Sequence, residues 1–508
     1  MKTPWLLRPL ETAVLASLFA LAFRYPGALG GWLEPVAALA FPVFLMEAVF
    51  RGRHAFWTWL TLLAGLLFLY AWVPQTLASK GGLPLGVALL GTLLLSLWEA
   101  TGLWAVTLGS RWVGRRSGPL GAALGAALLL LAWESWGFHV YPWTWGAAFG
   151  ALPWTARSAA FLGASGLSAL AWGTGAWAGA TLAEGGPLRR VLAGPALALG
   201  LLALGGGAWL LLPRGPVRSL DLALIQPNYS AGQRLPGMEA DMWQRSDALL
   251  RASGLPRRDR PTLLLWPESS VLGRDDRQSD PRLNAEAARR GVAWLYGTEG
   301  GLLNLVRGEA PGQPTFLFAK TEPMAFGERM PGPEPLRRWL DQQLGFVSQE
   351  AGELHEGCAF PVPAPGGPLR VHPLLCSEAL LPERTRRGLE LGHAELLSNL
   401  TNDGWFERSI ATDLHAAQIR LRAPELGVPL VRATLTGKSG LFREDGRFQL
   451  WGGPLSEDAY ALELQWRPVH TPARSGWLLP LLASALALGI LALRVLPRLG
   501  WGTLSWKT

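Results

Sequence analysis

The chain has 508 residues, of which 49% are hydrophobic and 17% charged, and its mean hydropathy is +0.20. This composition is too apolar for an ordinary water-soluble protein and excludes intrinsic disorder. Two cysteines are too few for a disulfide scaffold, and no Cys/His spacing is typical of a metal site. We therefore expect no metal and no other cofactor. The formal charge of +8 comes from basic residues scattered between apolar runs, so we expect no nucleic-acid partner either.

Long apolar runs fill the first 213 residues. A membrane-spanning helix needs about 20 mostly apolar residues, and the candidate runs lie at 9–23, 32–50, 55–74, 84–107, 118–138, 157–182, 190–212 and 476–496. The first run could belong to a signal peptide, but no small-residue cleavage site follows it, so we expect it to be retained. The sequence predicts a membrane domain over 1–213 with about seven helices, a water-soluble domain over 214–473, and a membrane helix with a short tail over 474–508.

Lysines and arginines in the short loops predict the orientation, because such residues concentrate on the cytoplasmic side. With the N-terminus inside, most of these residues fall in inner segments, and the outer loops contain only Arg24, Lys80 and Arg157. We therefore expect both termini in the cytoplasm and the 214–473 domain on the outer face.

The 214–473 domain alternates short apolar runs with helical stretches rich in arginine and glutamate. This alternation predicts an α/β layered domain. The predicted strands are 220–226, 262–266, 292–298, 315–320, 369–376, 395–399 and 428–433.

Three reactive side chains follow apolar strands directly, where a loop can present them to a pocket. They are Glu268, Lys320 and Cys376. A thiol needs a base and a cation to become a nucleophile, and glutamate and lysine have those properties. Each residue alone is more typical of a structural role, since an isolated cysteine in a strand is usually buried core and an isolated glutamate or lysine is usually solvated. Their combination favours acyl-transfer chemistry.

The short sequence motifs around these residues resemble those of the nitrilase (carbon-nitrogen hydrolase) superfamily. They are Trp266-Pro267-Glu268-Ser269, Lys320 with Phe326-Gly327-Glu328, Cys376-Ser377-Glu378, and Asn402-Asp403-Gly404-Trp405-Phe406. The flanking membrane helices, with Glu134 and Tyr141-Pro142-Trp143, narrow the resemblance to the membrane-anchored branch of apolipoprotein N-acyltransferases, whose patterns also match Gln418 to Arg422, Val431-Arg432-Ala433-Thr434 and Thr436-Gly437. The resemblance implies an αββα sandwich and a multi-pass protein of the bacterial inner membrane with its catalytic domain in the periplasm.

The resemblance also implies roles for individual residues. Cys376 would be the nucleophile, Glu268 the general base and Lys320 the oxyanion stabiliser. Further residues would position these groups or the substrate, although structural roles fit them equally well: Glu328, Glu378, Asn402, Trp405, Phe406 and Glu134. The chain departs from the family pattern at Glu322, Ser377 and Gly137, which puts the preferred lipid headgroup in question more than the reaction class.

By the same resemblance, Cys376 would take an acyl chain from a membrane phospholipid and pass it to the α-amine of a diacylglyceryl apolipoprotein, by a ping-pong route in a monomeric enzyme. Two alternatives stay open: a membrane-anchored amidase that uses water as acceptor, and an inactive descendant that serves as a transporter or assembly partner. The acyltransferase mechanism requires a free thiol, so we expect no bridge between Cys376 and Cys358, and a partly buried Cys358. Intramembrane Glu47, Glu99 and Glu134 are functional candidates by default.

Overall fold

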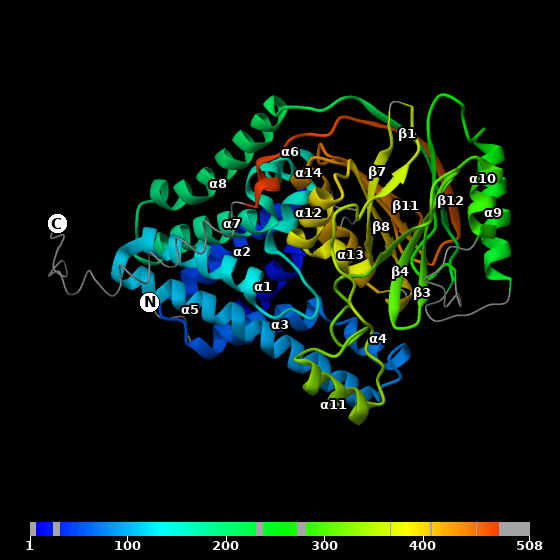
Figure 1. The fold of residues 1–508 in the computed structure, drawn as a ribbon. Helices are drawn as coiled ribbons and strands as arrows, with labels where there is room; N and C mark the ends of the chain where they lie inside the picture. The colour runs from blue at the N-terminus through cyan, green and yellow to red at the C-terminus, as the bar shows by residue number, and fades with distance from the viewer. Residues whose placement is uncertain are drawn as a thin grey trace.

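The computed structural model describes residues 7–23, 31–229, 237–271, 281–365, 367–406, 409–453 and 455–476. Helices make up the first part of the chain and two β-sheets the second, as Figure 1 shows. The last predicted membrane run, 476–496, lies outside the described residues except for its first position.

Every apolar run of the first 213 residues is helical. The helices are α1 (Arg8–Ala22), α2 (Leu33–Phe50), α3 (Ala55–Leu69), α4 (Val73–Ser79), α5 (Leu85–Trp136), α6 (Pro153–Ala156), α7 (Ala159–Ala183) and α8 (Leu188–Ala208). The 3-10 turn η2 (Trp145–Ala151) lies between α5 and α6, and η3 (Trp209–Leu211) follows α8. The runs 84–107 and 118–138 both fall in α5, which is broken at Gly118 (φ 69°) just before Pro119. Glycine adopts this left-handed conformation without a side-chain clash, and proline then starts a new helix.

The predicted number of about eight membrane helices is not confirmed. Within the described ranges, three helical segments are long and apolar enough to cross a membrane, namely α2, α5 and 188–211, or four if the bent pair of α3 and α4 forms one broken span. Helix α1 has 15 residues, which extend about 22 Å at 1.5 Å per residue, against the roughly 30 Å of a bilayer core. Helix α7 is interrupted at Gly163 (φ 64°).

Two six-stranded sheets form the second part of the chain. The first has the order β12-β1-β2-β3-β4-β5 and the second β11-β10-β9-β8-β7-β6. The strands of the first sheet are β1 (Arg218–Gln226), β2 (Thr262–Leu265), β3 (Ala293–Gly300), β4 (Leu303–Glu309), β5 (Phe316–Ala319) and β12 (Asp458–Trp466). Those of the second are β6 (Phe360–Val362), β7 (Leu369–Leu375), β8 (Leu396–Thr401), β9 (Leu430–Thr434), β10 (Ser439–Phe442) and β11 (Phe448–Trp451).

All seven predicted strands are present, so the α/β prediction is confirmed. Strands β1, β2 and β3 run parallel in the first sheet, and β7, β8 and β9 run parallel in the second. Strand β5 runs in the same direction as β3, because two successive antiparallel pairings separate them. The carboxyl ends of β2 and β5 therefore meet at one edge of the first sheet.

Apolar side chains are buried on both faces of each sheet. Leu222 and Leu224 of β1 pack with Val371 and Leu375 of β7 in a cluster between the sheets. The outer face of the first sheet packs on α9 (Met238–Ala252) and α10 (Pro281–Arg290). On the outer face of the second sheet lie α12 (Pro382–Leu391) and α13 (Ala411–Ile419), and Figure 1 shows the resulting four layers with the helix bundle beyond α12 and α13. The other elements among the described residues are helices α11 (Glu334–Leu344) and α14 (Arg422–Leu426) and the 3-10 turns η4 (Cys376–Leu380), η5 (Asp403–Trp405) and η6 (Pro472–Ser475).

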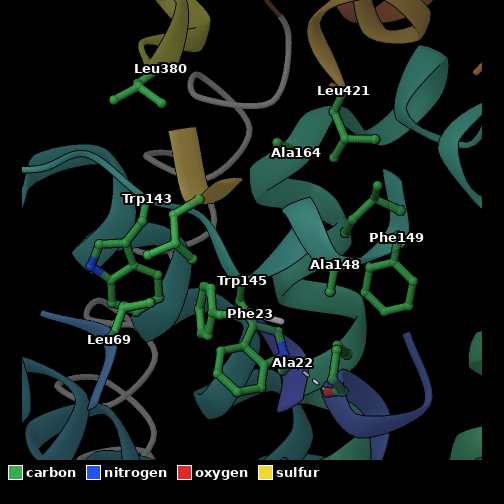
Figure 2. Close-up of a cluster of buried hydrophobic side chains, with 14 of the residues drawn as sticks. Ala22, Phe23, Leu69, Trp143, Trp145, Ala148, Phe149, Ala164, Leu380 and Leu421 are labelled. Carbon is green, nitrogen blue, oxygen red and sulfur yellow. Dashed lines mark hydrogen bonds between the residues drawn. The ribbon is translucent and has the colours of Figure 1, made fainter. Parts of the chain in front are cut away.

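A continuous apolar core joins the helix bundle to the second sheet. Figure 2 shows Trp143, Trp145 and Phe23 of the bundle in the same cluster as Leu380 and Leu421, which belong to the sheet part of the chain. The ring of Phe23 lies 5.3 Å, edge to face, from both tryptophan rings.

Polar contacts add to this interface. Arg420 forms a buried ion pair with Glu34 of α2, and the Gln418 side-chain oxygen accepts a hydrogen bond of 2.9 Å from the backbone N–H of Thr144. The sheets are therefore docked on the bundle through buried contacts of both kinds.

Candidate active site

Glu268 lies three residues beyond the end of β2 and is almost completely buried. One carboxylate oxygen accepts a hydrogen bond of 2.7 Å from the side chain of Asn304, and the other accepts one of 2.8 Å from the backbone N–H of Asn402. Burial raises the pKa of Glu268 above its ordinary value, although the nearby Lys320 ammonium partly offsets this effect. A buried carboxylate with a raised pKa is suited to accept a proton.

Lys320 follows β5 directly and is only 1% exposed. Its ammonium donates to Glu328 at 2.7 Å and lies 3.6 Å from a carboxylate oxygen of Glu268. Burial by itself lowers the pKa of Lys320, but the two carboxylates raise it well above the ordinary value. The lysine therefore carries a fixed positive charge inside the protein at neutral pH.

Cys376 follows β7 and begins the turn η4. Its backbone has a φ of 48°, in the left-handed region that residues with a side chain rarely adopt, and the residue is 9% exposed. Burial, followed by the charge of Glu268, raises the pKa of the thiol to about 12, although Lys320 acts in the opposite direction. The resting group at neutral pH is thus a thiol, placed within electrostatic range of the carboxylate and the ammonium.

Two further glutamates hold the loops around these groups. Glu328 binds Lys320 with one oxygen and accepts from the backbone N–H of Met324 at 2.7 Å with the other. Glu378 accepts from the backbone N–H and the hydroxyl of Thr321, both at 2.7 Å, and from the backbone N–H of Leu375 at 2.8 Å. Because Thr321 follows the lysine and Leu375 precedes the cysteine, Glu378 fixes the two loops to each other.

The remaining predicted site residues lie at different distances from this centre. Asn402 donates its backbone N–H to Glu268, and Phe406 is buried against Trp72 with ring centroids 5.0 Å apart. Trp405 is 37% exposed, and its carbonyl accepts a hydrogen bond of 3.1 Å from Thr76 of α4. The Asn402–Phe406 run therefore connects the candidate site to the helix bundle.

Glu134 does not lie beside Glu268, Lys320 and Cys376. Its carboxylate accepts a hydrogen bond of 2.9 Å from the backbone N–H of Trp145. It also lines a cavity of about 410 Å³ between α5, α7 and α12, and the residues that line this cavity include none of Glu268, Lys320 or Cys376. The structure does not bring Glu134 together with these three residues.

Glu47 and Glu99 have partners within the bundle. Glu47 pairs with Arg51, one turn further along, and Glu99 is fully buried with its carboxylate 2.8 Å from the ring nitrogen Nδ1 of His139. Among the described residues, no group of three or more His, Cys, Asp or Glu side chains could hold a metal ion.

The positions that depart from the family pattern have identifiable environments. Glu322 forms a half-buried ion pair with Arg384, and both residues line the cavity that contains Glu134. A side chain at position 137 has no room in this backbone, since its Cβ would lie 2.4 Å from the carbonyl oxygen of Trp133. Ser377 is buried in η4.

Both cysteines are free, as predicted. The prediction of a partly buried Cys358 is wrong, because this residue is completely buried and its thiol donates to the carbonyl of Gly388. The apolar residues that flank it pack it into the core between the sheets.

Sequence reasoning missed several polar side chains that the strands bring to the centre. Asn304 of β4 binds both Glu268 and Glu328, at 2.7 and 3.3 Å. Asn399 of β8 donates to the carbonyl of Cys376 at 3.1 Å. The signal in the sequence is a polar residue inside an otherwise apolar strand, where burial requires a hydrogen-bond partner.

Comparison with known proteins gives results that agree with the resemblance noted in the sequence. Residues 303–457 match the carbon-nitrogen hydrolase family, a range that contains Lys320 and Cys376 and begins after Glu268. The chain is 30% identical over 338 residues to the apolipoprotein N-acyltransferase of Allorhizobium ampelinum, covering 62% of this chain and 60% of that protein. It is 31% and 32% identical to those of Rhodopseudomonas palustris and Bradyrhizobium diazoefficiens, over 53% of each chain.

The chain thus spans between half and two thirds of the length of these curated relatives. The predicted resemblance to apolipoprotein N-acyltransferases is confirmed, and the two sheets form a nitrilase-like carbon-nitrogen hydrolase fold accompanied by several long apolar helices.

Proposed function

We propose that this chain is a membrane-bound N-acyltransferase that moves an acyl chain from a phospholipid to the α-amine of a diacylglyceryl apolipoprotein. The observation that carries the proposal is the buried group of Glu268, Lys320 and Cys376 at one edge of a carbon-nitrogen hydrolase fold. The curated relatives support the choice of substrates, since they are named apolipoprotein N-acyltransferases.

The first half-reaction forms a thioester. The Cys376 sulfur attacks the carbonyl carbon of a phospholipid ester while its proton moves to Glu268. A tetrahedral oxyanion results, and the Lys320 ammonium stabilises it. The carbon–oxygen ester bond then breaks, and Glu268 returns the proton to the departing oxygen, which leaves as the hydroxyl of a lysophospholipid.

The second half-reaction transfers the chain to nitrogen. The neutral α-amine of the apolipoprotein cysteine attacks the thioester carbonyl and gives a proton to Glu268. The carbon–sulfur bond breaks, an amide forms, and the sulfur recovers a proton from Glu268. The enzyme returns to its starting state, and because both substrates use one centre in turn, ping-pong kinetics follow.

Burial sets the timing of the proton transfers. The pKa of Cys376 is raised to about 12, so only a very small fraction of the thiol is ionised at neutral pH before the reaction. Deprotonation must therefore accompany the attack on the ester, and Glu268 has to lie within reach of the sulfur at that moment. The hydrogen bonds from Asn304 and Asn402 hold the Glu268 carboxylate in place for this step.

The helix bundle has a physical purpose in this scheme. A lipid that left the bilayer would expose its acyl chains to water, at a cost of about 0.8 kcal/mol for each methylene. The aromatic contact between Phe406 and Trp72, and the hydrogen bond from Thr76 to Trp405, connect the candidate site directly to the bundle. An enzyme docked in this way can act on lipids that stay in the membrane.

Intact-mass analysis of the purified full-length protein tests the proposal. Wild type is incubated with phospholipid alone, and then with a synthetic diacylglyceryl-cysteine peptide. We expect an acyl adduct that hydroxylamine removes and that the peptide amine discharges. Cys376→Ala should form no adduct, whereas Cys358→Ala, which removes the other thiol, should behave like wild type.

Two results would contradict the proposal. An adduct that survives in Cys376→Ala would place the nucleophile elsewhere. An adduct that water discharges while the peptide gains no chain would favour an amidase-like hydrolase instead.

A further inference from the structure

A row of polar side chains crosses the parallel strands of the second sheet beside Cys376. The strand register aligns Leu374 of β7 with Asn399 of β8, and Asn399 with Arg432 of β9. The last two are completely buried in strands that otherwise consist largely of apolar residues. A buried arginine is costly unless its charge is paired and its donors are used, so this row requires a physical explanation.

Asn399 is attached to the nucleophile turn. Its side-chain amide donates to the carbonyl of Leu374 at 3.2 Å and to the carbonyl of Cys376 at 3.1 Å. Its side-chain oxygen accepts a hydrogen bond of 2.6 Å from Arg432. The arginine therefore orients the amide, and the amide holds the two carbonyls on either side of Leu375.

Arg432 is also attached to the loop that follows β8. Its other terminal nitrogen donates to Asp403 at 2.7 Å, and the second oxygen of Asp403 lies 3.2 Å from the ring nitrogen Nδ1 of His415. Asp403 packs against Gly437, where an added Cβ would lie 2.0 Å from a carboxylate oxygen. Only glycine leaves room for this carboxylate, which accounts for Gly437 in the sequence.

The same loop holds the candidate base. Asn402, the residue before Asp403, donates its backbone N–H to Glu268 at 2.8 Å. Arg432 is thus connected to both candidate groups. Through Asn399 it is linked to the turn that contains Cys376, and through Asp403 it is linked to the peptide that binds Glu268.

We propose that Asn399, Arg432, Asp403 and His415 form a positioning network that sets the Cys376 sulfur and the Glu268 carboxylate at a fixed separation for proton transfer. None of these four residues needs to touch the substrate. The left-handed backbone of Cys376 supports this role, because a strained conformation persists only where the surrounding structure holds it. The inference rests on one part of the proposed function, the roles of Cys376 as nucleophile and Glu268 as its base, and does not depend on which acyl donor or acceptor the enzyme uses.

The test measures single-turnover acylation of the full-length enzyme in mixed micelles of detergent and phosphatidylethanolamine. Asn399→Leu removes the contact with the Cys376 carbonyl. Arg432→Lys keeps the positive charge, but a single ammonium cannot replace the two terminal nitrogens that donate to Asn399 and Asp403. The matched control is Asp221→Asn, since Asp221 is another buried aspartate near arginines, located on β1 of the other sheet. Thermal unfolding is recorded for every variant.

A displacement of about 1 Å can cost roughly 100-fold in rate. We therefore expect Asn399→Leu to slow acylation about 100-fold, with the half-saturating phospholipid concentration unchanged within twofold. Arg432→Lys should show a smaller loss, and Asp221→Asn should acylate like wild type. A merely structural role predicts instead that activity falls only with the fraction of folded protein.

Alkylation of Cys376 by iodoacetamide separates the two proposals. If wild type forms no acyl adduct while Asn399→Leu alters the alkylation rate, the proposed function fails and the positioning network stands. If wild type forms the adduct and both Asn399→Leu and Arg432→Lys acylate at the wild-type rate while folded, the positioning network is overturned.

Discussion

A single methyl group added at Gly297 should displace the candidate base without changing any charge. Gly297 lies in β3, and its backbone faces the Trp266–Ser270 turn, where its N–H donates to the carbonyl of Pro267 at 3.1 Å. A Cβ at this position would lie 2.4 Å from the Cα of Glu268 and 2.9 Å from the carbonyl oxygen of Pro267. Both neighbours are backbone atoms, so no side-chain rotation can relieve the clash.

The geometry sets the size of the effect. Carbon atoms in ordinary contact lie about 3.5 Å apart, so Gly297→Ala requires Glu268 to move by about 1 Å. Such a displacement is expected to slow formation of the acyl-enzyme by up to about 100-fold. Overpacking of this kind also costs about 1 to 3 kcal/mol of stability.

Single-turnover acylation followed by intact mass, together with thermal unfolding, measures both effects. The matched control is Gly300→Ala in the same strand, where the added Cβ would meet only the end of the Leu305 side chain, at 2.7 Å. We expect Gly300→Ala to lose some stability but to acylate at close to the wild-type rate. If folded Gly297→Ala acylates as fast as Gly300→Ala, the rate does not depend on the position of Glu268, and the reasoning is refuted.

Three further predictions follow from the charges. Between about pH 6 and 9, alkylation of Cys376 should accelerate about tenfold per pH unit, since its pKa is about 12; a plateau near neutral pH would contradict this. Burial by itself raises the pKa of Asp403, but Arg432 and His415 together lower it below its ordinary value. Their pairing with Asp403 therefore stabilises the protein above about pH 4, and this contribution is lost as pH falls further; thermal unfolding of Asp403→Asn should lack this acid-induced loss. Glu34→Gln removes the carboxylate from the buried ion pair with Arg420 and should cost about 3 to 5 kcal/mol by thermal unfolding. The exposed control Glu334→Gln should change stability by less than about 0.5 kcal/mol, and equal effects would argue against a buried pair.

The strands and the first candidate residues could be predicted because both depend on short stretches of sequence. An apolar run bounded by turn residues is visible in the sequence, and so is a reactive side chain directly after it. Glu268, Lys320 and Cys376 satisfy this pattern. Strand direction places the ends of β2 and β5 at one edge of the first sheet, and the packing of the second sheet against the first adds the end of β7. Strands β6 and β11, at the edges of the second sheet, have only three and four residues, too few to show an alternating pattern, and the sequence did not indicate them.

The residues that hold the site could not be predicted, because their roles depend on strand register. Asn304, Asn399 and Arg432 lie inside strands, and a shift of one position would turn each side chain to the opposite face of its sheet. Which strands are neighbours, and in which alignment, is decided by the packing of the whole domain. The number of membrane helices depends in the same way on breaks such as Gly118, where a local backbone angle divides one apolar stretch.

The sequence also could not specify the protonation states, and these decide how the candidate site would work. Glu268 and Glu328 flank the single ammonium of Lys320, so the buried group has one net negative charge when both carboxylates are ionised. A separate thiolate would add a second negative charge in a region shielded from water, which is why the pKa of Cys376 is raised. Transfer of the thiol proton to Glu268 leaves the net charge unchanged. Burial therefore disfavours loss of the thiol proton to solvent but not its transfer to Glu268. This favours a mechanism in which the proton moves to Glu268 as the sulfur attacks the ester.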